Sequence, residues 1–422
     1  MTTPHRIPND IVDIVVATRR QVHRCPELSN EEFETTALLW RELASAGIND
    51  VRPVGRTGVV ADVRGSSSAR TVAVRADLDA LPLVEEARVP FASENNGVMH
   101  ACGHDVHAAT LLGVALAAQR ARDSFAGTLR FVFQPAEERE PLGARAVIAG
   151  GHLEDVCAII ALHVSPDFET GTVALRPGPA MASSDEFGII VRGRGGHAGW
   201  PNAGIDAIAT LAAIIQESQK IVSRRTDPRT PLVINFGKIT GGIAGNIVAD
   251  EARAEGTIRA LDETSRIEAR RLLHEIVTHV SWAHAAEGNL EVVTGEPVLY
   301  NDPTVMEVFR SSSRRLLGDS NVKELELPTM NSEDFAFYSQ VLPAAMIWLG
   351  TRNEEEGFTY PLHHPRFAVD EGAMAVGAEI LLATARSLLA DDRVRPRARA
   401  RDDQVVARQV ERLDGGRVER QQ

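Results

Sequence analysis

The chain has 422 residues, and its 45 Lys and Arg against 58 Asp and Glu give a formal net charge of −13. This acidity argues against a nucleic-acid partner, which would require a basic face. Hydrophobic residues make up 44% of the sequence, as is typical of a globular protein, and the length suggests two or three domains. The longest apolar stretches fall short of the ~20 residues of a membrane-spanning helix, so no membrane segment is expected.

The three cysteines, Cys25, Cys102 and Cys157, are an odd number at irregular spacing. This pattern is not that of a disulfide scaffold, and free or metal-bound thiols suit a reducing compartment. Asp10 and Asp13 stand where a secretory signal would have its apolar region. We therefore expect a cytoplasmic protein.

The first 181 residues predict an α/β unit. Helical spacing of apolar residues from 9 to 47 predicts two helices, and Ser29 with Glu32 forms an S-x-x-E capping box at the start of the second. Apolar runs then alternate with one helical pattern, which predicts an α/β layer sheet. The expected strands are 58–63, 71–77, 127–138 and 156–164, and the expected helix is 107–121.

The pattern changes near Ala182, where a β-α-β-β-α segment and a short strand begin, and the third strand of that segment is expected over residues 246–261. This order is typical of a compact α+β unit of about the size of a ferredoxin-like domain. Helices and short strands then return, and the stretch AAMIWLG is the clearest strand. We thus predict a first domain formed by residues 1–181 and 298–390, with an inserted domain over residues 182–297.

Residues 391–422 contain nine Arg and seven acidic residues, but no aromatic residue and no sustained apolar stripe. This composition is typical of a disordered tail. The alternative is an arginine-rich arm that contacts an anionic partner, which the nearly equal number of acids disfavours.

The segment VMHACGHDVHAA places three His, one Cys and one Asp within eight positions. In an extended segment, positions i and i+2 point to the same side, so Cys102 and His104 can reach one metal ion. Asp105 would then be the N-cap of the helix that follows. The alternative is a buried cluster of small polar residues at a helix N-terminus.

The stretch FQPAEE ends an apolar strand in two adjacent carboxylates, Glu137 and Glu138. Open α/β sheets place their sites at such strand ends. Neighbouring residues of an extended chain face opposite ways, so one Glu can ligate a cation while the other acts on water as general base. The alternative is two solvated acids that open the following helix and are stabilised by its dipole.

Further polar residues follow other predicted strands: Asp77 and Asp79 in RADLDALP, His163 in ALHVSP, and His363 with His364 late in the chain. Each alone is a weak signal, because a lone His at a strand end is more often hydrogen-bonded than a ligand. The expected topology brings several strand ends to one edge. Together these donors describe a hydrolytic site for two cations that activate water and polarise a carbonyl.

In this order, the motifs RADLDALP, GVMHACGHDVHAA, FQPAEE, GGHAGWP and NSEDFAFY resemble the amidohydrolase branch of the co-catalytic metallopeptidase superfamily. The resemblance extends over roughly residues 10 to 390, and hippurate hydrolases and auxin–amino acid conjugate hydrolases are the members that look most similar. It implies a three-layer α/β/α di-metal domain with an inserted ferredoxin-like α+β lid and dimerisation domain.

The resemblance also implies roles for single residues. Glu137 would be the general base, and Asp79 would lie behind the metal ligands and orient them. His197 of the lid would help to bind the substrate or its oxyanion, while Asn246 and Arg259 would grip a substrate carboxylate. The implied metal ligands are Cys102, as a bridge between two ions, His104, Glu138, His163 and His363. His363 is favoured over its neighbour because it holds the family position after Leu362.

The expected function is metal-dependent hydrolysis of the amide bond of small N-acyl amino acids, such as hippurate-like or N-acetyl substrates. Two divalent ions per subunit and a homodimer formed through the inserted domain are expected. A thiolate ligand favours Zn²⁺, Co²⁺ or Ni²⁺, and the resemblance also allows Mn²⁺. A dipeptidase or carboxypeptidase would use the same chemistry. A catalytically silent ligand-binding protein is the third alternative, which the filled ligand positions disfavour.

Overall fold

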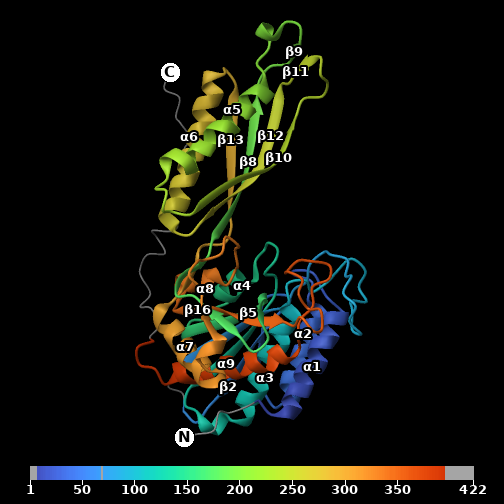
Figure 1. The fold of residues 1–422 in the computed structure, drawn as a ribbon, viewed down its shortest axis with the longest axis vertical. Coiled ribbons are helices and arrows are strands. Elements are labelled where there is room, and N and C mark those ends of the chain that lie inside the picture. Colours follow the sequence, from blue (N-terminus) through green and yellow to red (C-terminus); the bar gives the residue numbers. More distant parts are fainter. Residues whose placement is uncertain (1–6, 68–69, 395–422) are drawn as a thin grey trace.

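In the computed structural model, which describes residues 7–67 and 70–394, the chain forms two parts (Figure 1). The larger part contains an eight-stranded sheet, and the smaller, elongated part contains a four-stranded sheet with two helices. The chain enters the smaller part at Ala182 and leaves it through residues 295–298. The larger part is therefore built from both ends of the chain. The predicted domain boundaries at residues 181, 297 and 390 stay predictions.

Eight strands form the sheet of the larger part: β1 Asp50–Pro53, β2 Val59–Arg64, β3 Thr71–Asp77, β4 Thr128–Gln134, β5 Val156–Glu169, β6 Val173–Leu175, β15 Val322–Glu324 and β16 Ala344–Arg352. Their order is β1-β2-β4-β3-β5-β16-β6-β15. The four central strands β4, β3, β5 and β16 run parallel. β3 and β4 are buried along their whole length, which explains their nearly continuous apolar sequences.

Helices cover both faces of this sheet, and their bounds are α1 Asn9–Arg24, α2 Phe33–Ser45, α3 His104–Arg120, α4 Gly143–Ala149, α7 Pro303–Leu317, α8 Ala336–Val341 and α9 Gly372–Leu389. α1, α2, α3, α7 and α9 share one buried core with side chains such as Val72 and Val74 of β3. α4 and α8 share a second core with Ala73, which points to the opposite face. These two cores confirm the three-layer α/β/α arrangement.

The helix α9 is apolar and long enough to cross a membrane by length and composition, contrary to the expectation from the sequence. Most of it is buried inside the protein, where it packs against α3, β3 and β5. α9 is therefore a core helix. Its composition alone does not distinguish it from a membrane-spanning helix, because both are long and apolar.

The capping box expected at Ser29 and Glu32 does not form, and α2 begins at Phe33. Both side chains bind elsewhere: the Ser29 hydroxyl donates to Asp79 at 2.6 Å, and the Glu32 carboxylate accepts from a backbone N–H of the loop after β4. Backbone N–H groups of the first turn of α2 donate instead to the carboxylate of Glu27, at 2.9 Å each. Tertiary contacts thus replace the local cap.

Asp105 is not the N-cap of α3, which begins one residue earlier. The N-cap is Gly103 with φ of 87°, and a Cβ there would lie 2.5 Å from a methyl group of Val164. Only glycine fits both constraints. The buried carboxylate of Asp105 instead accepts a hydrogen bond from Nε of Arg19 at 2.7 Å, which ties α3 to α1.

The sheet of the smaller part has the order β10-β12-β8-β13, with all neighbours antiparallel. The strands are β8 Ser183–Arg192, β10 Leu232–Gly241, β12 Glu251–Ala260 and β13 Glu287–Thr294. α5 Ala207–Lys220, which continues as a π-helical turn Ile221–Arg225, and α6 Glu263–Ala283 pack on one face. At the base, β7 Gly178–Met181 pairs with β14 Leu299–Asn301.

The single strand expected over residues 246–261 is interrupted before β12. Its first part is β11 Ile247–Val248, which pairs with β9 Gly196–His197 rather than with the main sheet. β9 and β11 form a small two-stranded extension at the end of the smaller part farthest from the larger one (Figure 1).

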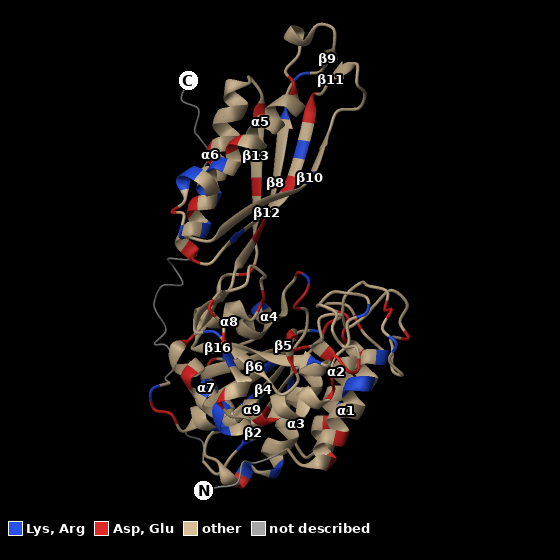
Figure 2. Ribbon diagram, viewed as in Figure 1, with Lys and Arg blue, Asp and Glu red and all other residues tan. Residues whose placement is uncertain are grey.

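Acidic and basic residues are mixed along the ribbon of both parts of the protein (Figure 2). On α6, for example, Arg271 pairs with Glu268 and Glu275, one helical turn to either side. Exposed pairs of this kind stabilise a helix only slightly, because solvent screens the two charges. They favour the helix without determining the fold.

The first residues of the predicted tail, 391–394, pack on the larger part. Backbone oxygens of Asp391 and Val394 accept hydrogen bonds from Arg70, and the side chain of Val394 is buried. The rest of the predicted tail, 395–422, lies outside the described residues.

Candidate metal centre and active site

The candidate site lies at the carboxyl edge of the parallel strands. Asp79 follows β3, Glu137 and Glu138 follow β4, and His163 is in β5, two positions beyond the last residue that pairs with β3. Because these strands are parallel neighbours, their ends bring residues far apart in sequence to one place.

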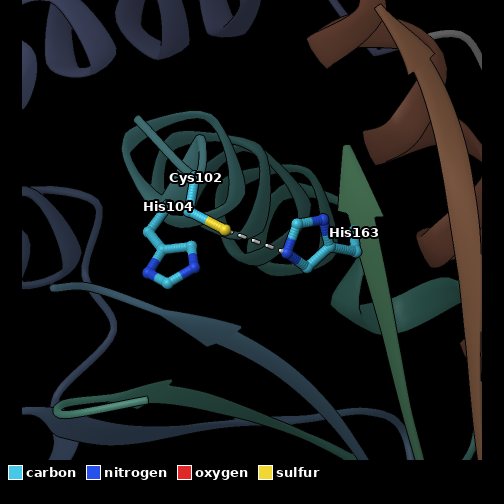
Figure 3. Close-up of side chains that lie close together, drawn as sticks. All are labelled: Cys102, His104 and His163. Carbon is cyan, nitrogen blue, oxygen red and sulfur yellow. Dashed lines mark hydrogen bonds between the residues drawn. The ribbon is translucent and has the colours of Figure 1, made fainter. Parts of the chain in front are cut away.

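A first donor group consists of Cys102, His104 and His163, all of them buried. Figure 3 shows Cys102 and His104 at the N-terminal end of α3, facing His163 on β5. The Sγ of Cys102 lies 3.5 Å from Nε2 of His163. One donor atom from each residue lies within 4.8 Å of the others, so the three side chains can hold one ion.

A second donor group consists of Cys102, Glu138 and His363. Nε2 of His363 lies 3.4 Å from Oε1 of Glu138. His363 has φ of 61°, and its backbone N–H donates to the oxygen of Ala101 at 2.8 Å. Cys102 belongs to both groups, so its sulfur can bridge two ions.

His364 is directed away from this cluster. Its Nδ1 accepts a hydrogen bond from the backbone of Arg366, and its ring stacks on Tyr360 with 4.6 Å between centroids. Of the two adjacent histidines, His363 is therefore the one beside Glu138.

Two buried atoms of the cluster indicate that these residues fit metal ions. Among the described residues, Nε2 of His104 and Oε1 of Glu138 have no hydrogen-bond partner, and they lie 4.0 Å apart. Histidine and carboxylate ligate divalent ions at about 2.0–2.2 Å, so a cation between the two atoms would satisfy both. The adjacent Cys102 and Glu138 side chains also raise the pKa of His363 to about 10, as expected where a positive charge is favoured.

Asp79 lies behind the candidate ligands. Its Oδ1 lies 3.2 Å from Nδ1 of His104, and its Oδ2 accepts from the backbone N–H of Glu138 at 2.9 Å. Carboxylates in this position fix the ring orientation of a ligating histidine. The contacts are those of a residue that orients two ligands.

Glu137 lies beside His104 and Glu138, but its carboxylate also contacts a segment near residue 334. Oε1 of Glu137 accepts from the backbone N–H of Asp334 at 3.3 Å. Burial and the carboxylates of Glu333 and Glu138 raise the pKa of Glu137 well above its ordinary value. A carboxyl group with a raised pKa is suited both to take a proton and to give it back.

A network behind the ligands was not predicted from the sequence. Asp77 lies 2.6 Å from Nδ1 of His107, whose Nε2 accepts from the backbone N–H of Val164 at 2.9 Å. This contact holds the backbone next to His163. The position of His107 on α3, one turn after His104, could have indicated that both rings face the same strands.

The sequence matches the family described as Peptidase family M20/M25/M40 over residues 73–387. The chain belongs to this family. N-acetyl-L-cysteine deacetylase of Bacillus subtilis is 37% identical over 377 residues, which cover 89% of this chain and 88% of the relative. Thermostable carboxypeptidase 2 of Saccharolobus solfataricus is 38% identical over 384 residues, covering 90% and 97%.

A plant relative, IAA-amino acid hydrolase ILR1-like 4 of Arabidopsis thaliana, is 36% identical over 376 residues, covering 88% of this chain and 85% of the relative. A solved structure from Bacillus subtilis, a dinuclear metal-binding peptidase from the M20 family, is similar with a TM-score of 0.79. It is 32% identical and covers 91% of this chain and 99% of that chain. The resemblance seen in the motifs and the predicted fold class are confirmed.

As an M20 family member with this donor set, the protein is a metal-dependent amidohydrolase with a site for two divalent metal ions. The residues that would hold the ions are Cys102, His104, Glu138, His163 and His363.

The three residues expected to act from the lid are not at this M20 site. His197 in β9 and Asn246 beside β11 are exposed at the tip of the smaller part (Figure 1). Their segments contact each other, since Ala198 donates its N–H to the oxygen of Asn246 at 3.0 Å. Arg259 lies at the base, where Nη1 donates to the backbone oxygen of Met330 at 2.9 Å. Their roles stay predictions.

Replacing Cys102 by Ser should lower metal affinity, because a poorly ionising hydroxyl replaces a bridging thiolate. The loss should exceed about 10–100-fold, which is typical when a residue that only contacts a metal ligand is replaced. The measurement is bound metal per chain after dialysis against graded chelator. Cys157→Ser, at a buried thiol outside both donor groups, is the matched control. Retention of both ions at wild-type affinity would show that Cys102 is not a ligand.

Proposed function

We propose that the protein hydrolyses small N-acyl amino acids, with hippurate-like and N-acetyl compounds as the substrate class. The observation that carries the proposal is the pair of donor groups sharing Cys102, next to the half-buried carboxylate of Glu137. Relatives named for N-acetylcysteine deacetylation and for hydrolysis of IAA–amino acid conjugates support an acylated amino acid as substrate.

When bound, two divalent cations would supply Lewis-acid chemistry, which polarises a scissile carbonyl and makes water more acidic. Glu137 takes a proton from the water that attacks the carbonyl carbon. As the C–N bond breaks, Glu137 gives that proton to the leaving amine nitrogen, and a carboxylate and a free amino acid result. Asp79 keeps His104 and Glu138 in place throughout, because it contacts both.

A panel of N-acetyl, N-benzoyl and indolyl-acyl amino acids tests the substrate class, with protein loaded separately with Zn²⁺, Mn²⁺, Co²⁺ or Ni²⁺. The proposal requires faster cleavage of acylated amino acids than of dipeptides with a free amino group. The reverse order would favour the carboxypeptidase or dipeptidase alternative, which the relative from Saccharolobus solfataricus supports. Binding without cleavage would instead indicate a silent ligand-binding protein.

His197 is proposed to complete the site of a second subunit. It lies at the remote tip of the smaller part, so the sheet that carries the metal donors does not position it. A homodimer formed through the smaller part would present its imidazole to the neighbouring metal centre, where it donates a hydrogen bond to the developing oxyanion. Asn246, beside it, and Arg259 at the base are proposed to bind the substrate carboxylate.

His197→Ala is expected to reduce turnover by about 10²–10³-fold with both metals retained, because an oxyanion donor is lost. Sharing between subunits is tested by mixing inactive His197→Ala protein with inactive Glu137→Gln protein under conditions of subunit exchange. Each heterodimer would then contain one intact site, and activity returns. If no activity returns although heterodimers form, His197 acts within its own chain or not at all.

A cytoplasmic location is also proposed, since Cys25, Cys102 and Cys157 are free thiols. A reducing compartment would keep Cys102 available as a thiolate.

A further inference from the structure

The candidate general base is held by a distant segment of the chain. Oε1 of Glu137 accepts its hydrogen bond from the backbone N–H of Asp334, 197 residues further along. Asp334 lies just before α8, in the NSEDFAFY stretch that sequence analysis used only as a motif. The direction of the Glu137 carboxylate therefore depends on where this N–H is fixed.

The side chain of Asp334 fixes it. This carboxylate is fully buried and accepts hydrogen bonds from Nη2 of Arg75 at 2.7 Å, from Nε2 of Gln134 at 2.7 Å and from the backbone N–H of Ala144 at 3.0 Å. Arg75 belongs to β3 and Gln134 to β4, two central strands of the sheet. The N–H that binds Glu137 is thus anchored to two buried central strands of the sheet.

The residues just before Asp334 are held from the other direction, by the base of the smaller part. The backbone N–H of Ala182 donates to the oxygens of Thr329 and Asn331, at 3.2 and 2.9 Å, and Arg259 donates to the oxygen of Met330. The Asp334 carboxylate therefore ties to β3 and β4 a segment that the smaller part also contacts.

We propose that Asp334 is a positioning residue for hydrolysis, whose carboxylate anchors the backbone N–H that orients Glu137. The inference rests on the proposed role of Glu137 as general base. A misplacement of about 1 Å can cost about 10²-fold in rate, so Asp334→Asn should lower kcat by about 10–10²-fold. KM and bound metal should stay near wild type, because neither donor group that shares Cys102 includes Asp334.

The carboxylates of Glu137, Glu333 and Asp334 are also close enough together to hold a cation. Arg75 already supplies positive charge there, since its Nη2 lies 2.7 Å from Asp334 and 3.0 Å from Glu333. The positioning role is therefore favoured. Loss of one metal equivalent per chain in Asp334→Asn would overturn it in favour of an ion.

A double-mutant cycle tests the proposal on the metal-loaded, full-length enzyme. The proteins are wild type, Glu137→Gln, Asp334→Asn and the double variant, and the probe is the acylated amino acid that wild type cleaves fastest in the panel above. If Asp334 acts through Glu137, then Asp334→Asn has no further effect on the residual turnover of Glu137→Gln. An equal fall in both backgrounds would overturn the proposal.

Asp62→Asn is the matched control, because Asp62 is a buried carboxylate that pairs with Arg130 near the start of β4. It should lower the melting temperature without lowering kcat. If Asp334→Asn leaves kcat as high as this control does, the proposal fails. Should Glu137→Gln itself stay active, the failure lies in the proposed function instead.

A second variant covers the case in which Asp334→Asn does not fold. Gln134→Leu keeps a side chain of similar size and leaves Asp334 intact, but it removes the hydrogen bonds from Gln134 to that carboxylate. It should show a smaller fall in kcat and the same absence of effect in the Glu137→Gln background. A fall of equal size in both backgrounds contradicts the proposal here too.

Discussion

Glu137→Gln is expected to reduce turnover by about 10²–10⁴-fold while both metal ions stay bound. The amide has nearly the shape of the carboxylate and can still accept the hydrogen bond from Asp334, but it cannot take a proton from water. The five residues that would hold the ions are unchanged. Steady-state kinetics and metal analysis on the same preparation measure both parts of the prediction.

Glu140→Gln is a suitable control for that experiment. Glu140 lies in the same loop, where its carboxylate pairs with Arg145 at 3.1 Å on the surface. Its replacement should leave kcat near wild type. Near-wild-type activity of Glu137→Gln would show that Glu137 is not the general base.

Arg75→Met should destabilise the protein strongly, by about 3–5 kcal/mol. The guanidinium of Arg75 is buried and lies within 3.0 Å of carboxylate oxygens of Asp77, Glu333 and Asp334. Removing it leaves these buried carboxylates without the cation that they share. Burial opposes the charge on Asp77, but His104, His107 and Arg75 together hold the pKa of Asp77 well below its ordinary value.

Thermal melting of the metal-loaded protein measures this loss. Arg64→Met is the control, because Arg64 pairs with Asp50 at 2.8 Å on the exposed end of β2, and such pairs contribute about 0–1 kcal/mol. Similar melting temperatures for the two variants would mean that the stability of the protein does not require Arg75 beside the three carboxylates.

Much of the larger part could be predicted because its strands show as local patterns in the sequence. Continuous apolar runs predicted β3, β4 and β5, and the density of His and Cys before α3 pointed to Cys102 and His104. The two predictions of helix caps, at Ser29 and Asp105, were wrong for the same reason. Each side chain has the chemistry of a cap, but each is used for a contact between distant elements, with Asp79 and Arg19 respectively.

Long-range contacts explain what the sequence could not show. Arg75 and Asp334 are 259 residues apart, and no local pattern links them. The break between β11 and β12 was also missed, because the apolar pattern continues across it while β11 pairs with β9. The resemblance to the family, through the order of the motifs, indicated that His363 would lie beside Cys102 and Glu138. The spacing of these residues in the sequence did not indicate it.

The position of β16 has a consequence for how the enzyme is made. β16 lies between β5 and β6, and α9 packs on α3 and β3, although both elements follow the inserted part in the chain. During synthesis, the first 300 residues therefore leave β5 with an unpaired edge in the middle of the future sheet. His363 follows β16 in the chain, so the second donor group is complete only after the smaller part and β16 have been made. The hydrolase therefore cannot acquire its full metal site before the smaller part exists.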